Sequence, residues 1–317
     1  MTDLAEAPSQ GVVRVAKVTS RSGHRIRRYS PGRMLAWAVL ILFIVITLFP
    51  FYWMLRTALS NNRTLFAHSG SWLPVDFTLG GFKRVLGLAS VEEAQAEGGS
   101  GASIQFWLYL RNSVIVSTAI TVGQVLFSAL AAYAFARLRW PGRDKVFFLF
   151  ICALMVPPIF TTLPNFVLMK DLGLLNTFPG IIAPYFFMTP FAVFFLRQFF
   201  LGVNREIEEA AMIDGAGHLT IFFRIILPIS SAPMATLGIL TFINAWNEYF
   251  WPLLVGQQDN VRVLTVALSI FKSQTPQGSP DWAGLMAGTL VAAVPVMLLF
   301  LAFGRRIVNS IQFTGIK

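Results

Sequence analysis

Apolar residues along this chain gather in six long runs, separated by segments that carry most of the charged residues. A run of about twenty apolar residues is long enough to cross the hydrocarbon core of a bilayer as an α-helix. The pattern therefore predicts an all-α integral membrane protein with six transmembrane helices. The predicted spans are Met34–Leu55, Ser113–Phe135, Val146–Leu168, Pro179–Phe199, Ser231–Val255 and Trp282–Phe303.

These spans divide the chain into a tail over residues 1–33, a six-span domain over residues 34–304 and a second tail over residues 305–317. The first run is too long for the apolar part of a signal peptide, and a polar segment of about thirty residues precedes it. We therefore expect it to remain in the protein as a span.

Prolines interrupt the third, fourth and sixth predicted spans. Each proline removes a helix hydrogen bond, which is tolerated in lipid only where neighbouring helices or cavity water satisfy the freed carbonyl. Together they favour a bundle that bends around a central cavity, although a packing kink explains any single one almost as well. The prolines are Pro157, Pro158, Pro164, Pro184, Pro190 and Pro295.

Composition supports the membrane assignment and excludes several functions. Hydrophobic residues make up 55% of the 317 residues and charged residues only 13%, more apolar surface than one soluble core can bury. The net charge of +10 is explained by basic residues beside spans, so no nucleic-acid partner is expected. Cys152 is the only cysteine, and the three histidines lie far apart, so neither a metal nor a cofactor is predicted.

The distribution of basic residues predicts the orientation of the spans. With both termini in the cytoplasm, sixteen Lys and Arg residues fall on the cytoplasmic side and eight on the opposite side. Cytoplasmic loops carry an excess of Lys and Arg. The count therefore places both tails, the loop after the second span and the segment after the fourth span in the cytoplasm.

That last segment, residues 201–230, is a hydrophilic island between two apolar runs, and we call it the coupling segment. Asn204 can cap a helix there by accepting a backbone N–H, and the acidic residues of 206–209 fall in its first turns, where the helix dipole favours anions. Residues 215–217 supply a stop, and Pro228 suits the first turn of the next helix. The pattern predicts a short cytoplasmic helix held between the fourth and fifth spans.

The coupling segment also resembles a known family. The sequence from Glu209 to Gly215, followed after nine residues by Ile225-Ile226-Leu227-Pro228, is similar to the EAA-x3-G-x9-I-x-L-P signature of permease subunits of ATP-binding-cassette importers at every fixed position. An ordinary loop helix that matches by chance is the alternative. The resemblance implies that ATPase coupling rests on Glu208, Glu209, Ala210, Ala211, Asp214, Gly215, Ile225, Leu227 and Pro228.

The resemblance implies partners and a mechanism. Such a permease lies in the bacterial cytoplasmic (inner) membrane and pairs with a second permease subunit. Each permease docks one subunit of a cytoplasmic ATP-binding-cassette ATPase dimer, and an extracytoplasmic sugar-binding protein delivers the substrate. ATP favours one global state of the spans over the other. This chain has no G-x-x-x-x-G-K-[ST] phosphate loop, so it is not expected to be an enzyme.

Resemblance to the carbohydrate-type branch of these permeases extends over most of the chain. Segments 76–79, 112–113, 132–137 and 246–253 are similar to that branch, and the last six residues resemble the end of the smaller maltose-type permease. Two features depart from it. Residues 92–101 have no counterpart and, being acidic and Gly-rich, are expected to form a flexible insertion. The tail is altered at residues 309–311, which leaves its role open.

The fifth predicted span carries polar residues that suit a substrate pathway. An ionisable group inside a span is costly and usually faces the bundle interior. Amides and carboxylates can bond sugar hydroxyls, while aromatic rings pack against sugar C–H faces. An interfacial aromatic belt with interhelical hydrogen bonds is an equally weighted alternative. The residues are Asn244, Trp246, Asn247, Glu248 and Tyr249.

Two other classes of protein compete with an importer permease. An ion-gradient-driven secondary transporter would use Glu248 as its ion site, but the chain shows one intramembrane acid and no clear internal repeat. A membrane-anchored signalling or assembly protein needs a soluble effector domain, and no segment between the spans is long enough. The last outward loop, residues 256–281, fits a partner contact or a mobile loop equally well.

Overall fold

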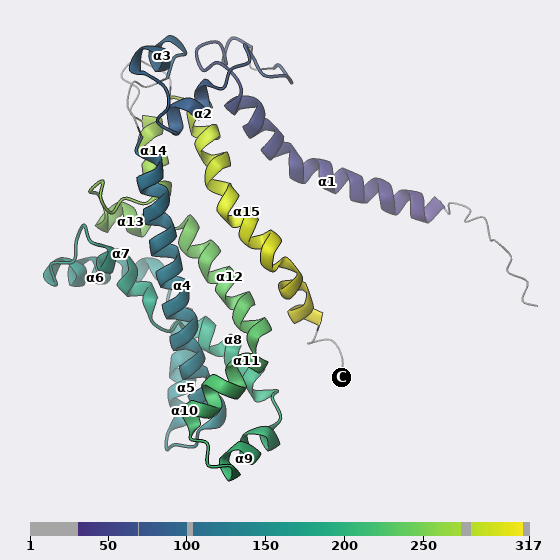
Figure 1. Cartoon of the computed structure of the whole chain (residues 1–317), viewed down its shortest axis with the longest axis vertical. Coiled ribbons are helices and arrows are strands. Elements are labelled where there is room, and N and C mark those ends of the chain that lie inside the picture. The colour runs from purple at the N-terminus through teal and green to yellow at the C-terminus, as the bar shows by residue number, and fades with distance from the viewer. Residues whose placement is uncertain (1–30, 69, 100–103, 274–279, 313–317) are drawn as a thin grey trace, which may run out of the picture. The chain divides into compact units, whose positions relative to one another are not determined.

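The computed structural model describes residues 31–68, 70–99, 104–273 and 280–312, and every regular element in those ranges is helical (Figure 1). The chain divides into two compact units, Met1–Pro50 and Phe51–Lys317. Most of the predicted N-terminal tail and the last five residues of the predicted C-terminal tail lie outside the described residues.

The described part of the first unit is the apolar helix α1, which spans Pro31–Ala58 and crosses the unit boundary at Pro50. All of its side chains up to Pro50 are exposed in the isolated chain. A helix that is apolar on every side is stable in lipid or inside a larger assembly. The first predicted span thus corresponds to one continuous helix, which is a candidate membrane span.

Within the described residues, three helices are long and apolar enough to cross a membrane alone: α1, α4 (Phe106–Arg137) and α15 (Trp282–Gln312). Three bent pairs raise the number of candidate spans to six. The first pair joins Arg143–Met155, made of α5 (Arg143–Cys152) and η1 (Ala153–Met155), to α6 (Pro158–Asp171) at 99°. The second joins α7 (Phe178–Phe186) to α8 (Pro190–Leu201) at 45°.

The third bent pair follows the short helix α9 (Arg205–Ile213) of the coupling segment. Its first arm comprises α10 (His218–Ile221), the π-helical turn η2 (Phe222–Ile226) and α11 (Leu227–Ile229). This arm meets α12 (Ser231–Asn247) at 80°. The chain then turns extended at Glu248, with a ψ of 125°, before α13 (Phe250–Val255).

The bends in the third and fourth candidate spans agree with the prolines predicted to interrupt them, whereas α15 continues through Pro295 as one helix and the bend at the start of the fifth span was not predicted. Pro158 begins α6 and Pro190 begins α8, as expected for a residue that has no backbone N–H to donate. Thr189 precedes Pro190 and caps α8, with its Oγ1 accepting the Ala192 N–H at 3.4 Å. Thr189 thus provides a polar side chain at the break between α7 and α8.

Helix α4 is the central element of the second unit and packs against α7, α8 and α12. Figure 1 shows α4 running between two ends, one formed by α5, α9 and α10 and the other by α2, α3 and α14. Small residues such as Ala129, Ala132 and Ala136 let α8 and α12 approach α4 closely, and this core continues into Phe222 and Ile226 of η2. The coupling segment thus shares a core with the spans.

The other end contains α2 (Gly80–Val85), α3 (Val91–Ala96) and α14 (Leu264–Ser273). Here the expectation of a flexible insertion is wrong for its described part. Ser90 and Glu93 form a capping box on α3, and Glu97 Oε2 lies 2.5 Å from Arg84 Nη1. The acidic composition suggested disorder because a local pattern cannot reveal an arginine on another helix. Residues 100–101 lie outside the described residues.

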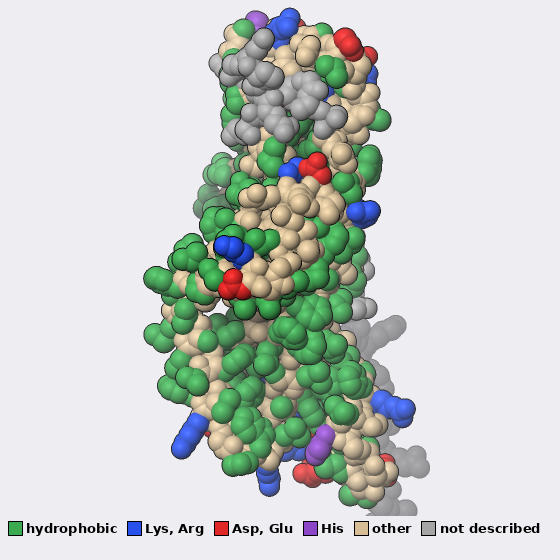
Figure 2. Space-filling view, turned by 90° about the vertical axis from the view of Figure 1, so that its left-hand side faces the viewer, with side chains coloured by type: hydrophobic (Ala, Val, Ile, Leu, Met, Phe, Trp, Pro, Cys, Tyr) green, Lys and Arg blue, Asp and Glu red, His purple; other side chains and the backbone are tan. Residues whose placement is uncertain are grey.

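The surface of the molecule suits a lipid environment. Figure 2 shows one face on which hydrophobic side chains cover the middle, interrupted by few charged ones. Several Lys and Arg side chains gather toward the lower end of this face. This separation agrees with the apolar runs and the charged loops of the sequence.

Candidate coupling helix and substrate cavity

The short helix predicted in the coupling segment is present as α9, which spans Arg205–Ile213. Asn204 caps it as predicted, with Oδ1 accepting the Glu206 N–H at 3.1 Å. The helix is followed by Gly215, whose φ of 84° lies in the left-handed region. The Ala216 N–H then bonds the Ala211 carbonyl at 2.9 Å, the pattern of a Schellman stop. A Cβ on Gly215 would meet no atom, so the position needs glycine for its backbone conformation and not for space.

Helix α9 has an inner and an outer face. Glu208 is buried, and Ala211, one turn later, packs against the core that joins α4, α8 and α12. Glu209 is exposed together with the large apolar side chains of Ile207, Met212 and Ile213, the last with 86% of its surface exposed. A charged group among exposed apolar side chains on a short helix is typical of a binding surface.

The inner face is held by a buried ion pair. Glu208 Oε1 lies 2.9 Å from Arg137 Nε at the end of α4, and Tyr133 Oη donates to Glu208 Oε2 at 3.4 Å. Arg137 also donates to the backbone carbonyls of Phe200 and Val203 at the end of α8. One arginine therefore ties α9 to both α4 and α8.

The remaining motif residues divide between packing and exposure. Ile225 and Leu227 are half-buried and pack against the same core, whereas Ala210, Asp214 and Pro228 are exposed. Sequence reasoning placed Glu208 with the partner-facing residues, but the structure turns it inward. It also missed Arg137 and Tyr133, although Ala211 three residues after Glu208 marks the buried side of α9.

A second feature is a cavity of about 220 Å³ at the breaks in the bent spans. Four helices or their ends contribute, so residues from distant parts of the sequence meet there. Its lining combines hydroxyl, amide and carboxylate groups with a few apolar side chains. The lining residues are Ile120, Gln124, Tyr185, Thr189, Thr241, Asn244, Ala245 and Glu248.

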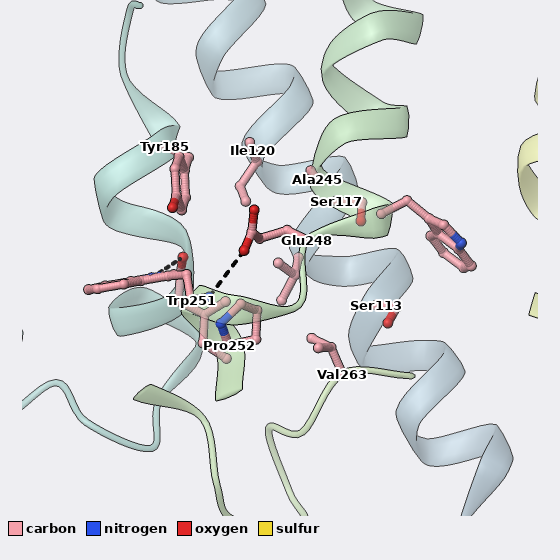
Figure 3. A pocket seen from close by; sticks show the side chains of 12 residues that line it. Ser113, Ser117, Ile120, Tyr185, Ala245, Glu248, Trp251, Pro252 and Val263 are labelled. Atoms are coloured by element: carbon pink, nitrogen blue, oxygen red, sulfur yellow. Dashed lines mark hydrogen bonds between the residues drawn. The ribbon is translucent and has the colours of Figure 1, made fainter. Parts of the chain in front are cut away.

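Glu248 is the acidic residue of this lining, and the break between α12 and α13 positions it. Its Oε1 accepts the Trp251 N–H at 3.1 Å, and its backbone carbonyl accepts from Thr265 Oγ1 at 3.0 Å. Figure 3 shows a smaller adjoining pocket, which shares Ile120, Tyr185, Ala245 and Glu248 with this cavity. The Glu248 carboxylate lies near Ile120 and Tyr185 there, and Trp251 Nε1 donates to two backbone carbonyls of α7. Gln124 Nε2 donates to Thr189 Oγ1 at 3.1 Å across the cavity wall.

The five polar and aromatic residues predicted for the pathway have different positions. Asn244 and Glu248 line the cavity. Trp246 is buried, and its Nε1 donates to the Ala292 carbonyl at 3.1 Å, which joins α12 to α15. Asn247 is exposed and bonds the Ile243 carbonyl, and the Tyr249 hydroxyl lies 3.3 Å from Ser269 Oγ.

The cavity residues that sequence reasoning missed are Gln124, Tyr185, Thr189 and Thr241. Thr189 alone carried a signal, since a threonine before proline often caps a helix at a break. No three His, Cys, Asp or Glu side chains in the described parts of the chain converge closely enough to hold a metal ion. The described site therefore offers hydrogen bonds and one carboxylate.

Comparison with known proteins places these features in context. Residues 124–312 match the family model described as "Binding-protein-dependent transport system inner membrane component". The chain is 32% identical to the probable ABC transporter permease protein YurM of Bacillus subtilis, over 92% of this chain and 91% of that protein. It is 33% identical to the diacetylchitobiose uptake system permease protein NgcG of Streptomyces coelicolor, over 87% and 86% of the two chains.

A solved structure shares the fold. A chain of a bacterial ABC transporter involved in the import of the acidic polysaccharide alginate superposes with a TM-score of 0.73 at 22% sequence identity. The match covers 88% of this chain and 97% of that chain.

Proposed function

The chain belongs to the family of binding-protein-dependent transport system inner membrane components, and we propose that it forms half of the translocation pathway of a carbohydrate importer. In this family ATP hydrolysis takes place in a separate subunit and a binding protein supplies the substrate. The proposed assembly contains this chain, a second permease, an ATPase dimer and an extracytoplasmic sugar-binding protein.

The observation that carries the proposal is the two-faced geometry of α9. Its inner face is fixed to α4 by the buried pair of Glu208 and Arg137, while its outer face presents Glu209 beside exposed Ile213. A partner that binds the outer face would therefore move α9 and the spans together. We assign the exposed residues Glu209, Ala210 and Asp214 to the ATPase contact, and Glu208, Ala211, Ile225 and Leu227 to transmission.

Transmission runs along α4. Arg137 and Gln124 belong to the same helix, and thirteen residues at about 1.5 Å each separate them by roughly 20 Å. Gln124 lines the cavity, so a tilt of α4 at its Arg137 end changes the cavity wall. Packed helices pass on such displacements because they switch between discrete arrangements and do not deform continuously.

The size of the cavity supports a half-pathway. Ligand sites for small molecules commonly occupy about 300–1,000 Å³, more than the 220 Å³ found here. A second permease facing this wall would complete a larger space. The amide of Asn244, the carboxylate of Glu248 and the ring of Tyr185 suit sugar hydroxyls and C–H faces, and NgcG is named for a disaccharide.

We propose six spans, counting each bent pair as one, with both tails in the cytoplasm as the excess of basic residues favours. Single cysteines in place of Asp144 and His218, in a Cys152→Ser background, should resist an impermeant thiol reagent in intact cells. A cysteine in place of exposed Gln257 should react. Outside labelling at position 218 would reverse the proposed topology.

The function is tested by reconstituting the complete transporter in vesicles and measuring carbohydrate uptake. Uptake should require ATP and the binding protein, and should persist when ionophores collapse the ion gradients. Glu248→Gln should leave this ionophore resistance unchanged. Uptake that runs without ATP and stops with the proton gradient would instead support the ion-driven alternative, which the family match does not favour.

A further inference from the structure

A basic hollow lies where the loop after α4 meets the first residues of α5 and α9. It has a volume of about 530 Å³, and its polar lining includes Arg139, Arg143, Asp144, Lys145 and Arg205. Neither the coupling helix contact nor the substrate cavity uses this hollow.

The charges of the hollow are not balanced by other residues that the structure describes. Arg143 Nε pairs with Asp144 Oδ1 at 2.9 Å, which leaves a net charge of +3 on the lining. Arg139, Lys145 and Arg205 are exposed and have no hydrogen-bond or ion-pair partner among the residues that the structure describes. Like charges held close together repel, so a bound anion would relieve the repulsion.

The hollow lies at a membrane surface because residues 138–142 connect two candidate spans. Trp140 lines it and packs against Phe135 with ring centroids 5.7 Å apart, at the level where interfacial tryptophans are common. Phe148 and Leu149 follow Lys145 by three and four residues and so share its side of α5. About 70% of each of these two side chains is exposed.

We propose that this hollow binds the phosphodiester headgroup of an anionic phospholipid, with an acyl chain lying along Phe148 and Leu149. Three cations without a partner among the described residues attract the singly charged phosphodiester, and the adjoining apolar side chains can hold the acyl chain that a free phosphate lacks. Because Arg205 is the first residue of α9, the bound lipid would hold the start of that helix against α5.

The test uses the assembled transporter in nanodiscs that contain phosphatidylglycerol with a photoactivatable acyl chain. Crosslinks should map to residues 139–149 and should be absent with the matching phosphatidylcholine probe. Each basic residue near an anionic headgroup contributes about fivefold to affinity. The crosslinking yield of the triple variant Arg139→Gln, Lys145→Gln, Arg205→Gln should therefore be at least about tenfold lower than that of the wild type. The control Lys83→Gln, Lys170→Gln, Arg224→Gln removes the same charge from other surfaces and should crosslink normally.

Other outcomes would overturn the proposal. Unchanged crosslinking in the triple variant would show that the hollow does not select the lipid. Equal displacement by inorganic phosphate or by chainless glycerophosphoglycerol would assign the hollow to a soluble phosphate. Loss of the ATPase subunit during purification, with lipid crosslinking intact, would assign the cations to a protein contact. Lys145→Gln alone, with an expected loss of about fivefold, decides the matter if the triple variant does not fold.

Discussion

Two buried arginines hold the two ends of the second unit, and they are paired differently. At one end Arg84 forms a fork with Asp281, with Nε 2.7 Å from Oδ2 and Nη2 2.9 Å from Oδ1, and it also pairs with Glu97. At the other end Arg137 has a single carboxylate partner among the described residues, Glu208, and bonds otherwise to backbone carbonyls.

The difference suggests different roles for the two ends: we interpret the Arg84 end as fixed and the α9 end as able to move when a partner binds. The Arg84 cluster joins α2, the residue after α3 and the residue before α15, and two glycines lie against its side chains beside a hollow of about 220 Å³. A Cβ on Gly80 would lie 1.4 Å from Glu97 Oε2, and one on Gly99 would lie 2.5 Å from the Arg84 side chain. The Arg137 pair instead ties the spans to one short helix whose opposite face is exposed. We interpret the Arg84 end as a frame and the α9 end as the part that a partner moves.

Removing Asp281 should have the largest effect on stability. Asp281→Ala leaves Arg84 buried with only Glu97 beside it, and breaking a buried pair costs about 3–5 kcal/mol. Thermal unfolding of the purified chain measures the loss. Asp259→Ala is the matched control because it breaks a more exposed pair with Arg262, which is worth about 1 kcal/mol or less. Equal losses of stability in the two variants would show that the buried pair of Arg84 contributes no more than an exposed surface pair.

Removing Glu208 should cost less, near the low end of that range at about 3 kcal/mol, because Arg137 keeps two carbonyl acceptors. Glu208→Ala should also weaken transport relative to ATP hydrolysis. Glu209→Ala, next in sequence but exposed, should change stability by no more than about 0.5 kcal/mol. The same thermal measurement compares the two. A larger loss for Glu209 would reverse the assignment of inner and outer faces.

The packing around Arg84 can be tested without touching a charge. Gly81→Ala places a methyl group 2.9 Å from the backbone carbonyls of Ala58 and Ala283 and should cost about 1–3 kcal/mol. Gly217→Ala lies before α10 with open space around it and should be nearly neutral. If the two variants melt at the same temperature, the packing around Arg84 is looser than the frame interpretation requires.

These contrasts show what the sequence could and could not predict. The apolar runs located the candidate spans, and Trp282–Phe303 coincides with the apolar part of α15. The cap at Asn204 and the turn at Gly215 were predictable because both depend on residues a few positions away. The partners of Arg84 and Arg137 were not, since they lie as far as 197 residues along the chain. Hydrophobic periodicity carries no information on such pairing.

The cavity was predicted only in part for the same reason. Asn244 and Glu248 were found because polar residues are rare inside a span. Gln124 and Thr241 are ordinary residues of polar character on long helices, and only the bends in neighbouring spans bring them to one wall. Trp246 and Tyr249 looked alike in the sequence, yet one is buried against α15 and the other is exposed.

The cavity assignment predicts a smaller effect, confined to transport. Asn244→Ala and Glu248→Gln should each lower uptake by roughly tenfold, the effect of one lost polar contact to substrate, while the complex still assembles. Asn247→Ala is the control, because its exposed side chain bonds its own helix and lies outside the lining. Uptake that falls only in step with the amount of assembled complex would place these residues in packing and not in the pathway.

The most direct test of the role of α9 is the number of sugar molecules imported per ATP hydrolysed by the reconstituted transporter. Glu209→Ala removes the exposed carboxylate, and Gly215→Trp forces a side chain onto a backbone with a φ of 84°. If α9 transmits the motion of the ATPase, the double variant should still insert and assemble, and its ratio should fall about 5- to 150-fold, the usual range of coupling between sites. A wild-type ratio in that variant would contradict the role of α9 as the coupling helix.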